Sequence, residues 1–144
     1  MSIESLVNQI QESRKAYELF NPSAASAEAI ADVVKQFERE FEHSLPVAYQ
    51  RLLRASDGVF ENGLTIWPCT PYWEFNESVI TANRDLRENI SDDFFYFGLR
   101  DDSAFVMEIR TGRLLAIELS GLAEWTEFAD FEAMIEFMLA RALD

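Results

Sequence analysis

The sequence predicts one α+β domain, with helices at its N-terminal end, a central and mainly antiparallel sheet, and an amphipathic helix at its C-terminal end. In the first third and in the last segment, apolar residues recur at three- and four-residue steps, the period of a helix. In the second half, three short apolar segments are separated by loops short enough for hairpins. The chain has 144 residues, of which 49% are hydrophobic, so we expect a single domain over residues 1–144.

Two helices are expected before residue 42. The first ends near Asn21-Pro22, because proline cannot continue a helix. Ser26 can cap the second, and Glu28 lies in its first turn, where the helix dipole favours an acid. The apolar stripe of the first helix consists of Ile3, Leu6, Val7, Ile10, Tyr17 and Phe20, and that of the second consists of Ile30, Val33, Val34, Phe37 and Phe41.

A third helix is expected after the segment His43-Ser44-Leu45-Pro46, which interrupts the second. Pro46 fits the first helical position, where its missing N–H loses no hydrogen bond. Asp57-Gly58 is expected to end this helix, since glycine adopts the left-handed C-terminal turn at little steric cost. The inward-facing positions are Tyr49, Leu52 and Leu53.

The apolar period changes in the second half of the chain. Leu64 to Trp67 forms a short strand pattern closed by Pro68, and helical spacing returns over about residues 74 to 88. Three strands follow, and Asp130 can cap a final helix. The strands are Phe94–Leu99, Ala104–Ile109 and Arg113–Glu118, and the apolar stripe of the final helix is Phe131, Met134, Ile135, Met138 and Leu139.

The stretch SDDFFYFGLRDDSAF, residues 91 to 105, places four consecutive aromatic residues between two aspartate pairs. Because apolar side chains point to both sides of this strand, we expect it in the middle of the sheet, covered on both faces. The ends of the strand must reach water. Asp92-Asp93 and Asp101-Asp102 would mark these ends and contribute to an acidic rim.

The net charge of −14 argues against nucleic acid or an anionic membrane surface as a partner, because both would be repelled. A basic partner is favoured, unless the charge only keeps the protein soluble. Residues 1–60 carry a net charge of −3 and residues 61–144 carry −11, so the second half dominates the field. No apolar run could span a bilayer, and the start MSIESLVNQI lacks the pattern of a signal peptide, so we expect a cytoplasmic location.

Few residues could support enzyme chemistry. Cys69 and His43 are the single residues of their kinds, so a Cys-His pair would require them to meet across the fold, and packing roles are favoured. The aspartate pairs could hold a divalent cation, but they lack the D-x-D-x-D-G spacing, and solvated strand ends are the simpler interpretation. A carboxylate pair for acid–base work stays open, because no pair stands out among many acids. Since no nucleotide-binding or nucleophile motif is present, we expect a protein that is not an enzyme and binds no metal or cofactor.

The three tryptophans divide into two groups. Trp67, at the end of a strand, is expected to be buried. Tyr72, Trp73 and Trp125 are bordered by acids, a composition typical of an interface that anchors with rings and selects with charge. The bordering acids are Glu74, Glu77, Glu124 and Glu127.

The order of FEREFEHSLPVAYQRLLRASDG, a short strand, a helix, FFYFGLRDDSAFVMEIRTG and a last helix with DFEAMIEFM resembles the SUKH superfamily over about residues 30 to 142. The helix over residues 1 to 20 is additional. Many members carry a Gly-rich turn after the apolar-Gly strand, whereas this chain has the acidic turn Arg100-Asp101-Asp102. The matching positions, which mark the fold and include no catalytic residue, are Leu45, Pro46, Tyr49, Leu53, Gly58, Phe97, Gly98, Phe131 and Phe137.

The resemblance implies a non-enzymatic protein-binding domain. SUKH members include bacterial immunity proteins that neutralise polymorphic or contact-dependent toxins, and a yeast regulator of cell-wall synthesis. We therefore expect an immunity protein with a basic toxin domain as its partner, and a regulatory or scaffold adaptor of the yeast type is the alternative. The candidate partner-binding residues are Tyr72, Trp73, Glu74, Glu77, Asp92, Asp93, Asp101, Asp102, Glu124, Trp125 and Glu127.

Overall fold

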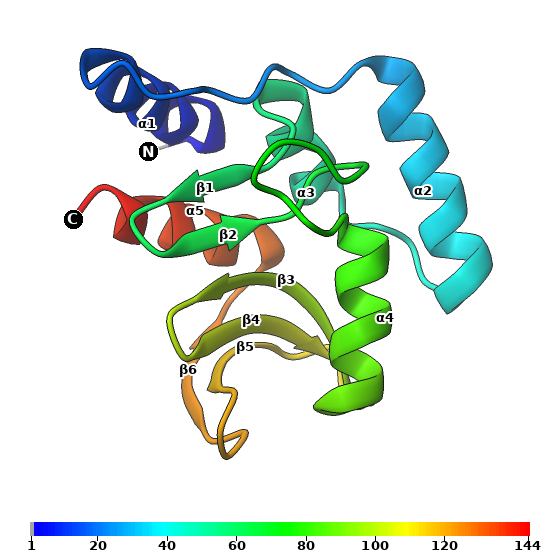
Figure 1. The fold of residues 1–144 in the computed structure, drawn as a ribbon. Coiled ribbons are helices and arrows are strands. Elements are labelled where there is room, and N and C mark those ends of the chain that lie inside the picture. The colour runs from blue at the N-terminus through cyan, green and yellow to red at the C-terminus, as the bar shows by residue number, and fades with distance from the viewer. Residues whose placement is uncertain (1) are drawn as a thin grey trace.

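The computed structural model describes residues 2–144, and this part of the chain forms five helices and one six-stranded antiparallel sheet (Figure 1). The helices are α1 (Ile3–Ala16), α2 (Ala27–Phe41), α3 (Val47–Ala55), α4 (Val79–Asn89) and α5 (Phe131–Ala142). The strands are β1 (Val59–Glu61), β2 (Leu64–Ile66), β3 (Phe94–Arg100), β4 (Ser103–Glu108), β5 (Leu114–Glu118) and β6 (Glu124–Phe128). The predicted α+β class, with helices at both ends of the chain, is confirmed.

The strands pair in chain order from β1 to β6, each antiparallel to the next. The three closely spaced strands that the sequence predicts are β3, β4 and β5, and they are joined as hairpins. Two further strands were not predicted. β1 pairs with β2 across Asn62-Gly63, whose φ angles of 50° and 83° suit a two-residue hairpin turn, and β6 pairs with β5 at the far edge of the sheet.

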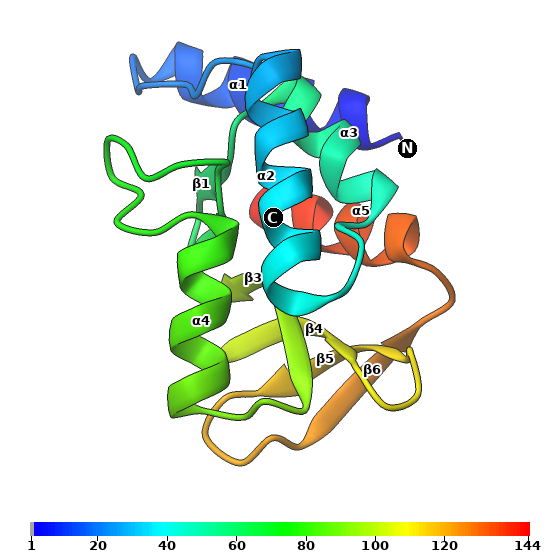
Figure 2. The ribbon, with the colours of Figure 1, turned by 90° about the vertical axis from the view of Figure 1, so that its right-hand side faces the viewer.

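The four consecutive aromatic residues of β3 are buried, as predicted, and none is more than 7% exposed. The Phe95 ring lies 5.4 Å from the Phe37 ring of α2. The Phe97 ring lies 5.8 Å from the Tyr49 ring of α3 and 4.8 Å from the Phe131 ring of α5. β3 therefore packs against α2, α3 and α5. Figure 2 shows α1, α3 and α5 together on one side of the sheet.

α4 lies beside the first half of β3, where the neighbouring strand β2 has ended (Figure 1). The buried side chain of Asn83 replaces that strand: its Oδ1 accepts a hydrogen bond of 2.7 Å from the Tyr96 N–H, and its Nδ2 donates one of 2.9 Å to the Tyr96 carbonyl. The backbone of β3 is thereby satisfied at a position without a strand neighbour.

The first helix is shorter than predicted. α1 ends at Ala16, and the left-handed backbone of Glu18, with a φ angle of 56°, turns the chain away from the helix axis. Tyr17 and Phe20, which the sequence assigned to the buried stripe, are consequently 77% and 45% exposed.

The helix expected over residues 74 to 88 begins later, at Val79. Ser78 caps it: the Ser78 Oγ accepts from the Thr81 N–H at 3.2 Å, and the Thr81 Oγ1 accepts from the Ser78 N–H at 2.9 Å. Phe75 lies outside this helix, in a tight turn whose backbone hydrogen bonds join it to Tyr72.

The other predicted helix ends agree more closely with the structure. Ser26 and Asp130 cap α2 and α5 with side-chain hydrogen bonds, as expected. Pro46 is the N-cap of α3 rather than its first residue. Gly58 does not cap α3, which ends at Ala55; its φ angle of 96° instead turns the chain into β1.

Candidate functional site

The predicted partner-binding residues lie in separate parts of the surface. Tyr72, Trp73, Glu74 and Glu77 belong to the loop between β2 and α4, and Glu124, Trp125 and Glu127 belong to the edge strand β6. The aspartate pairs lie at opposite ends of β3, whose seven residues span roughly 20 Å at about 3.3 Å per residue. The two pairs therefore do not meet in one cluster.

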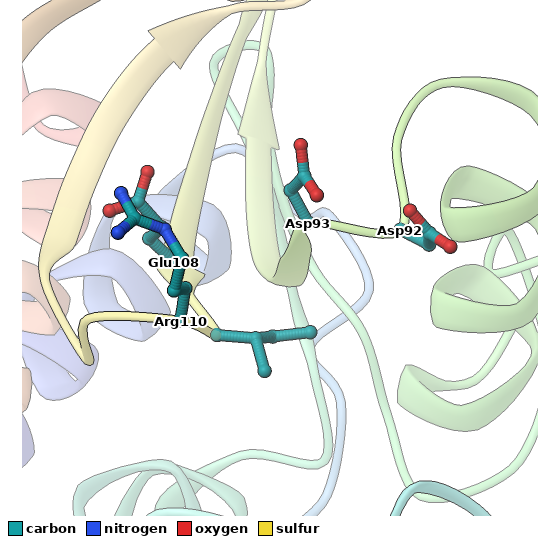
Figure 3. A pocket seen from close by; sticks show the side chains of 5 residues that line it. Asp92, Asp93, Glu108 and Arg110 are labelled. Carbon is teal, nitrogen blue, oxygen red and sulfur yellow. The ribbon is translucent and has the colours of Figure 1, made fainter.

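Asp92 and Asp93 line an open hollow of about 450 Å³ together with Glu108, Ile109 and Arg110. Figure 3 shows the two aspartate side chains projecting in different directions from the segment before β3. Within residues 2–144, no group of three or more histidine, cysteine or acidic side chains is arranged to hold a metal ion. These acids contribute charge to the surface without converging on one point.

Asp101 and Asp102 lie beside Trp125, and the sequence did not predict that these three residues are neighbours. They line a hollow of about 270 Å³ that also includes Arg100 and Arg141. The Trp125 ring is 42% exposed and lies 5.9 Å from the Phe137 ring, over which the Arg141 guanidinium is placed at 4.8 Å. Two arginines balance two aspartates here, so the hollow has no net preference for a cation.

Glu124 and Glu127 are already paired. Both carboxylates bind Arg113, with shortest distances of 2.7 Å and 2.8 Å to its Nη2. These ion pairs are exposed and partly neutralise the acids that border Trp125.

Trp73 belongs to an exposed apolar patch, which we call the Trp73 patch and define as Leu19, Phe20, Phe60 and Trp73. Each of the four residues is 42% to 49% exposed. The Trp73 ring lies 4.4 Å from the Phe20 ring and 6.2 Å from the Phe60 ring. Sequence reasoning missed the patch because it placed Phe20 on a buried helix face and did not assign β1. Figure 2 shows the loop after β2 projecting from the molecule beside β1.

Arg14 lies beneath the Trp73 patch and joins its three segments. The residue is 6% exposed; its Nε donates to the Phe20 carbonyl and its Nη1 to the Phe60 carbonyl, both at 2.8 Å. Its Nη1 also pairs with the Glu61 carboxylate at 3.1 Å, and the Trp73 ring centroid lies 5.8 Å from the guanidinium. Arg14 follows Ile10 at helical spacing, which places it on the buried apolar stripe of α1. The sequence could therefore have indicated that Arg14 is buried.

Two hollows flank the Trp73 patch and share Phe60 and Glu74. The first, of about 390 Å³, is also lined by Leu19, Glu61 and Trp73. The second, of about 280 Å³, we call the Glu77 hollow. Its lining residues are Phe60, Thr65, Trp67, Glu74, Phe75, Asn76, Glu77 and Leu99.

The Glu77 hollow combines apolar walls with carboxylates. Burial raises the pKa of Glu77 above its ordinary value, and the charge of Asp85 raises it further. The predicted burial of Trp67 is confirmed. Tyr72 is half-buried, and its hydroxyl donates to the Asp57 carbonyl at 2.7 Å, so this predicted binding residue is engaged in holding the loop.

The environments of Cys69 and His43 differ. Cys69 is buried beside Asp57, and burial together with this negative charge raises the pKa of its thiol to about 12. At neutral pH the thiol is therefore protonated and a poor nucleophile. The His43 ring lies against the Phe95 ring, with 4.9 Å between the centroids.

No protein-family model matches the chain, and no curated protein sequence matches it either. In the described residues, no helix combines the length and apolar character needed to cross a membrane.

Proposed function

We propose that the protein is a non-enzymatic protein-binding domain, and within that class a bacterial immunity protein that binds and neutralises a basic toxin in the cytoplasm. The observation that carries the binding function is the Trp73 patch with acids beside it. Aromatic side chains that are exposed next to charged groups are typical anchors of protein interfaces.

The charge of the protein supports a basic partner. Residues 61–144 carry a net charge of −11, and this half includes the loop after β2 and both aspartate pairs. A negative field of this kind attracts a basic protein and repels nucleic acid. The toxin as partner rests on the resemblance to the SUKH superfamily.

The test begins with the gene next to the one that encodes this chain. If it encodes a long protein with a variable toxic C-terminal region, that region is expressed in a bacterial host with and without this protein. We expect growth to be restored only when the two proteins form a complex, which is measured by isothermal titration calorimetry. Recovery of growth without a stable complex would contradict the proposal, and capture of a host regulatory protein instead would favour the adaptor alternative.

The same assay separates binding from chemistry. His43→Ala and Cys69→Ser variants that fold should protect cells as well as the unmodified protein, because neither residue belongs to the Trp73 patch. Loss of protection with either folded variant would indicate a catalytic or redox mechanism.

A further inference from the structure

The Glu77 hollow has the composition of a receptor for a basic side chain. Its walls are aromatic or aliphatic at Phe60, Trp67, Phe75 and Leu99, and its charged lining groups are two carboxylates with no arginine or lysine. A long basic side chain has the matching form, because it buries an apolar stem along apolar walls while its charged end reaches an acid.

The carboxylate of Glu77 is available to such a side chain. Among residues 2–144, no donor forms a hydrogen bond or ion pair with it, and the charge that acts on it most is the like charge of Asp85. Six other acids of the described residues are paired with arginines, among them Glu4 with Arg51 and Glu40 with Arg84. An external cation gains the most binding free energy beside a half-buried carboxylate that has no cation of its own.

The Trp73 patch supplies apolar contact area beside this carboxylate. Phe60 lines both the Glu77 hollow and the neighbouring hollow beneath Trp73, so the two features form one continuous surface. The buried charge of Arg14 is already paired with Glu61, so it does not repel an incoming cation strongly. The surface therefore fits a segment in which an arginine is followed closely by an apolar residue.

We propose that the Glu77 hollow binds an arginine side chain of a basic protein partner, with Glu74 and Glu77 receiving the guanidinium and the Trp73 patch packing against an adjacent apolar residue of the same segment. Arginine fits better than lysine because its planar guanidinium binds two carboxylate oxygens at once and stacks on aromatic rings. This proposal rests on the proposed protein-binding function and names the surface and the chemistry that it would use.

The three tryptophans provide separate reporters for the test. Trp67 lines the Glu77 hollow, Trp73 belongs to the patch, and Trp125 lies in the hollow with Asp101 and Asp102. Their indole N–H signals are followed by NMR while the peptide acetyl-Leu-Arg-Leu-Arg-amide is added at millimolar concentration, the range expected for so small a ligand. We expect saturable shifts for Trp67 and Trp73 and none for Trp125. The matched peptide with citrulline in place of arginine, which has the same shape without charge, should bind at least about tenfold more weakly.

Two double variants complete the design. Glu74→Gln with Glu77→Gln removes the charge of the hollow and keeps its shape, so arginine-peptide affinity should fall by about tenfold or more. Asp101→Asn with Asp102→Asn also removes two negative charges, but from outside the Glu77 hollow. This variant should leave the affinity for the arginine peptide nearly unchanged. Equal losses in the two variants, equal binding of the citrulline peptide, shifts confined to Trp125, or the absence of any shift would each overturn the proposal.

Failure of this inference can be told apart from failure of the proposed function. If the glutamine double variant binds the cognate toxin as tightly as the unmodified protein, the arginine site is wrong while the immunity function stands. If the arginine peptide binds and no toxin is neutralised, the site stands while the immunity function fails. A dimer in light scattering that Trp73→Ala converts to a monomer would show that a second copy covers the patch, and would overturn the proposal.

Discussion

At the residue scale, Asn83 shows how one buried amide replaces a strand neighbour. Its Nδ2 donates to the Val79 carbonyl at 2.7 Å as well as to Tyr96, so Asn83→Leu would leave the Tyr96 N–H and carbonyl without partners. We expect this change to lower the free energy of unfolding by roughly 3 kcal/mol, the cost of two unsatisfied buried groups. Urea denaturation measures it. Asn89→Ala, on the exposed end of the same helix, is the control and should cost under about 0.5 kcal/mol.

Glu77 gives a second prediction at this scale, on stability against pH. Because its pKa is raised in the folded protein, the folded state holds the Glu77 proton more tightly than the unfolded state does. The contribution of Glu77 to the free energy of unfolding is complete below the ordinary glutamate pKa and is lost as pH rises through the folded pKa. At pH 7, Glu77→Gln should therefore equal or exceed the unmodified protein in stability, by under about 1 kcal/mol because solvent screens the group.

Glu40 is the matched control for this prediction. The hydrogen bond from Arg84 lowers the pKa of Glu40, so its contribution is present at neutral pH and is lost as pH falls through the folded pKa. Glu40→Gln should thus be equal or slightly lower in stability at pH 7, the sign opposite to Glu77→Gln. Thermal unfolding at pH 7 and at pH 4 compares the two, and a loss of stability at pH 7 in Glu77→Gln would contradict the assignment of an uncompensated charge.

At the scale of single elements, β3 carries the packing of the fold. Phe97 contacts Tyr49 of α3 and Phe131 of α5, so Phe97→Ala opens a cavity between two helices and the sheet. We expect a loss of roughly 3 to 5 kcal/mol in the free energy of unfolding. Phe20→Ala, at an exposed ring, serves as the control. A change in Phe97→Ala below about 1 kcal/mol in chemical denaturation would mean that β3 is not the core strand.

The same elements show what the sequence could predict. Long periodic segments and side-chain caps gave α2, α5 and the strands β3 to β5, because periodicity reflects which face is buried. β1 was missed although Asn62-Gly63 is a strong hairpin signal, since its three residues offer almost no period. β6 was missed because Glu124 to Phe128 is an edge strand with mostly exposed side chains.

The candidate site was less predictable than the fold for a related reason. Trp73, Glu74 and Glu77 were identified from composition, but the neighbours that make them a surface come from distant segments. Phe20 follows α1 and Phe60 lies on β1, and only the tertiary fold brings both rings to Trp73. Aspartate pairs that look equivalent in the sequence are separated by the length of β3.

At the scale of the whole molecule, internal ion pairs leave much of the negative charge uncompensated. Within residues 2–144, the ion pairs are Arg14 with Glu61, Arg51 with Glu4 and Glu132, Arg84 with Glu40, and Arg113 with Glu124 and Glu127. Glu74, Glu77 and both aspartate pairs have no ion-pair partner in this part of the chain. These six acids therefore place uncompensated negative charge beside the Trp73 patch and at the two ends of β3.

This distribution predicts how a basic partner should associate. The association rate with the cognate toxin should fall markedly as salt rises, because the Debye length shrinks from about 30 Å at 0.01 M to about 10 Å at 0.1 M, while the dissociation rate changes less. Reversing the charge of Asp92 and Asp93 together should slow association at low salt. Trp73→Ala should mainly speed dissociation. The binding free energy should weaken by roughly 2 kcal/mol, the loss that is typical of an anchor residue. Stopped-flow measurements across a salt series separate the two effects. If the association rate does not respond to salt, or if the partner is acidic, the negative charge serves solubility alone and the Trp73 patch binds through apolar contact.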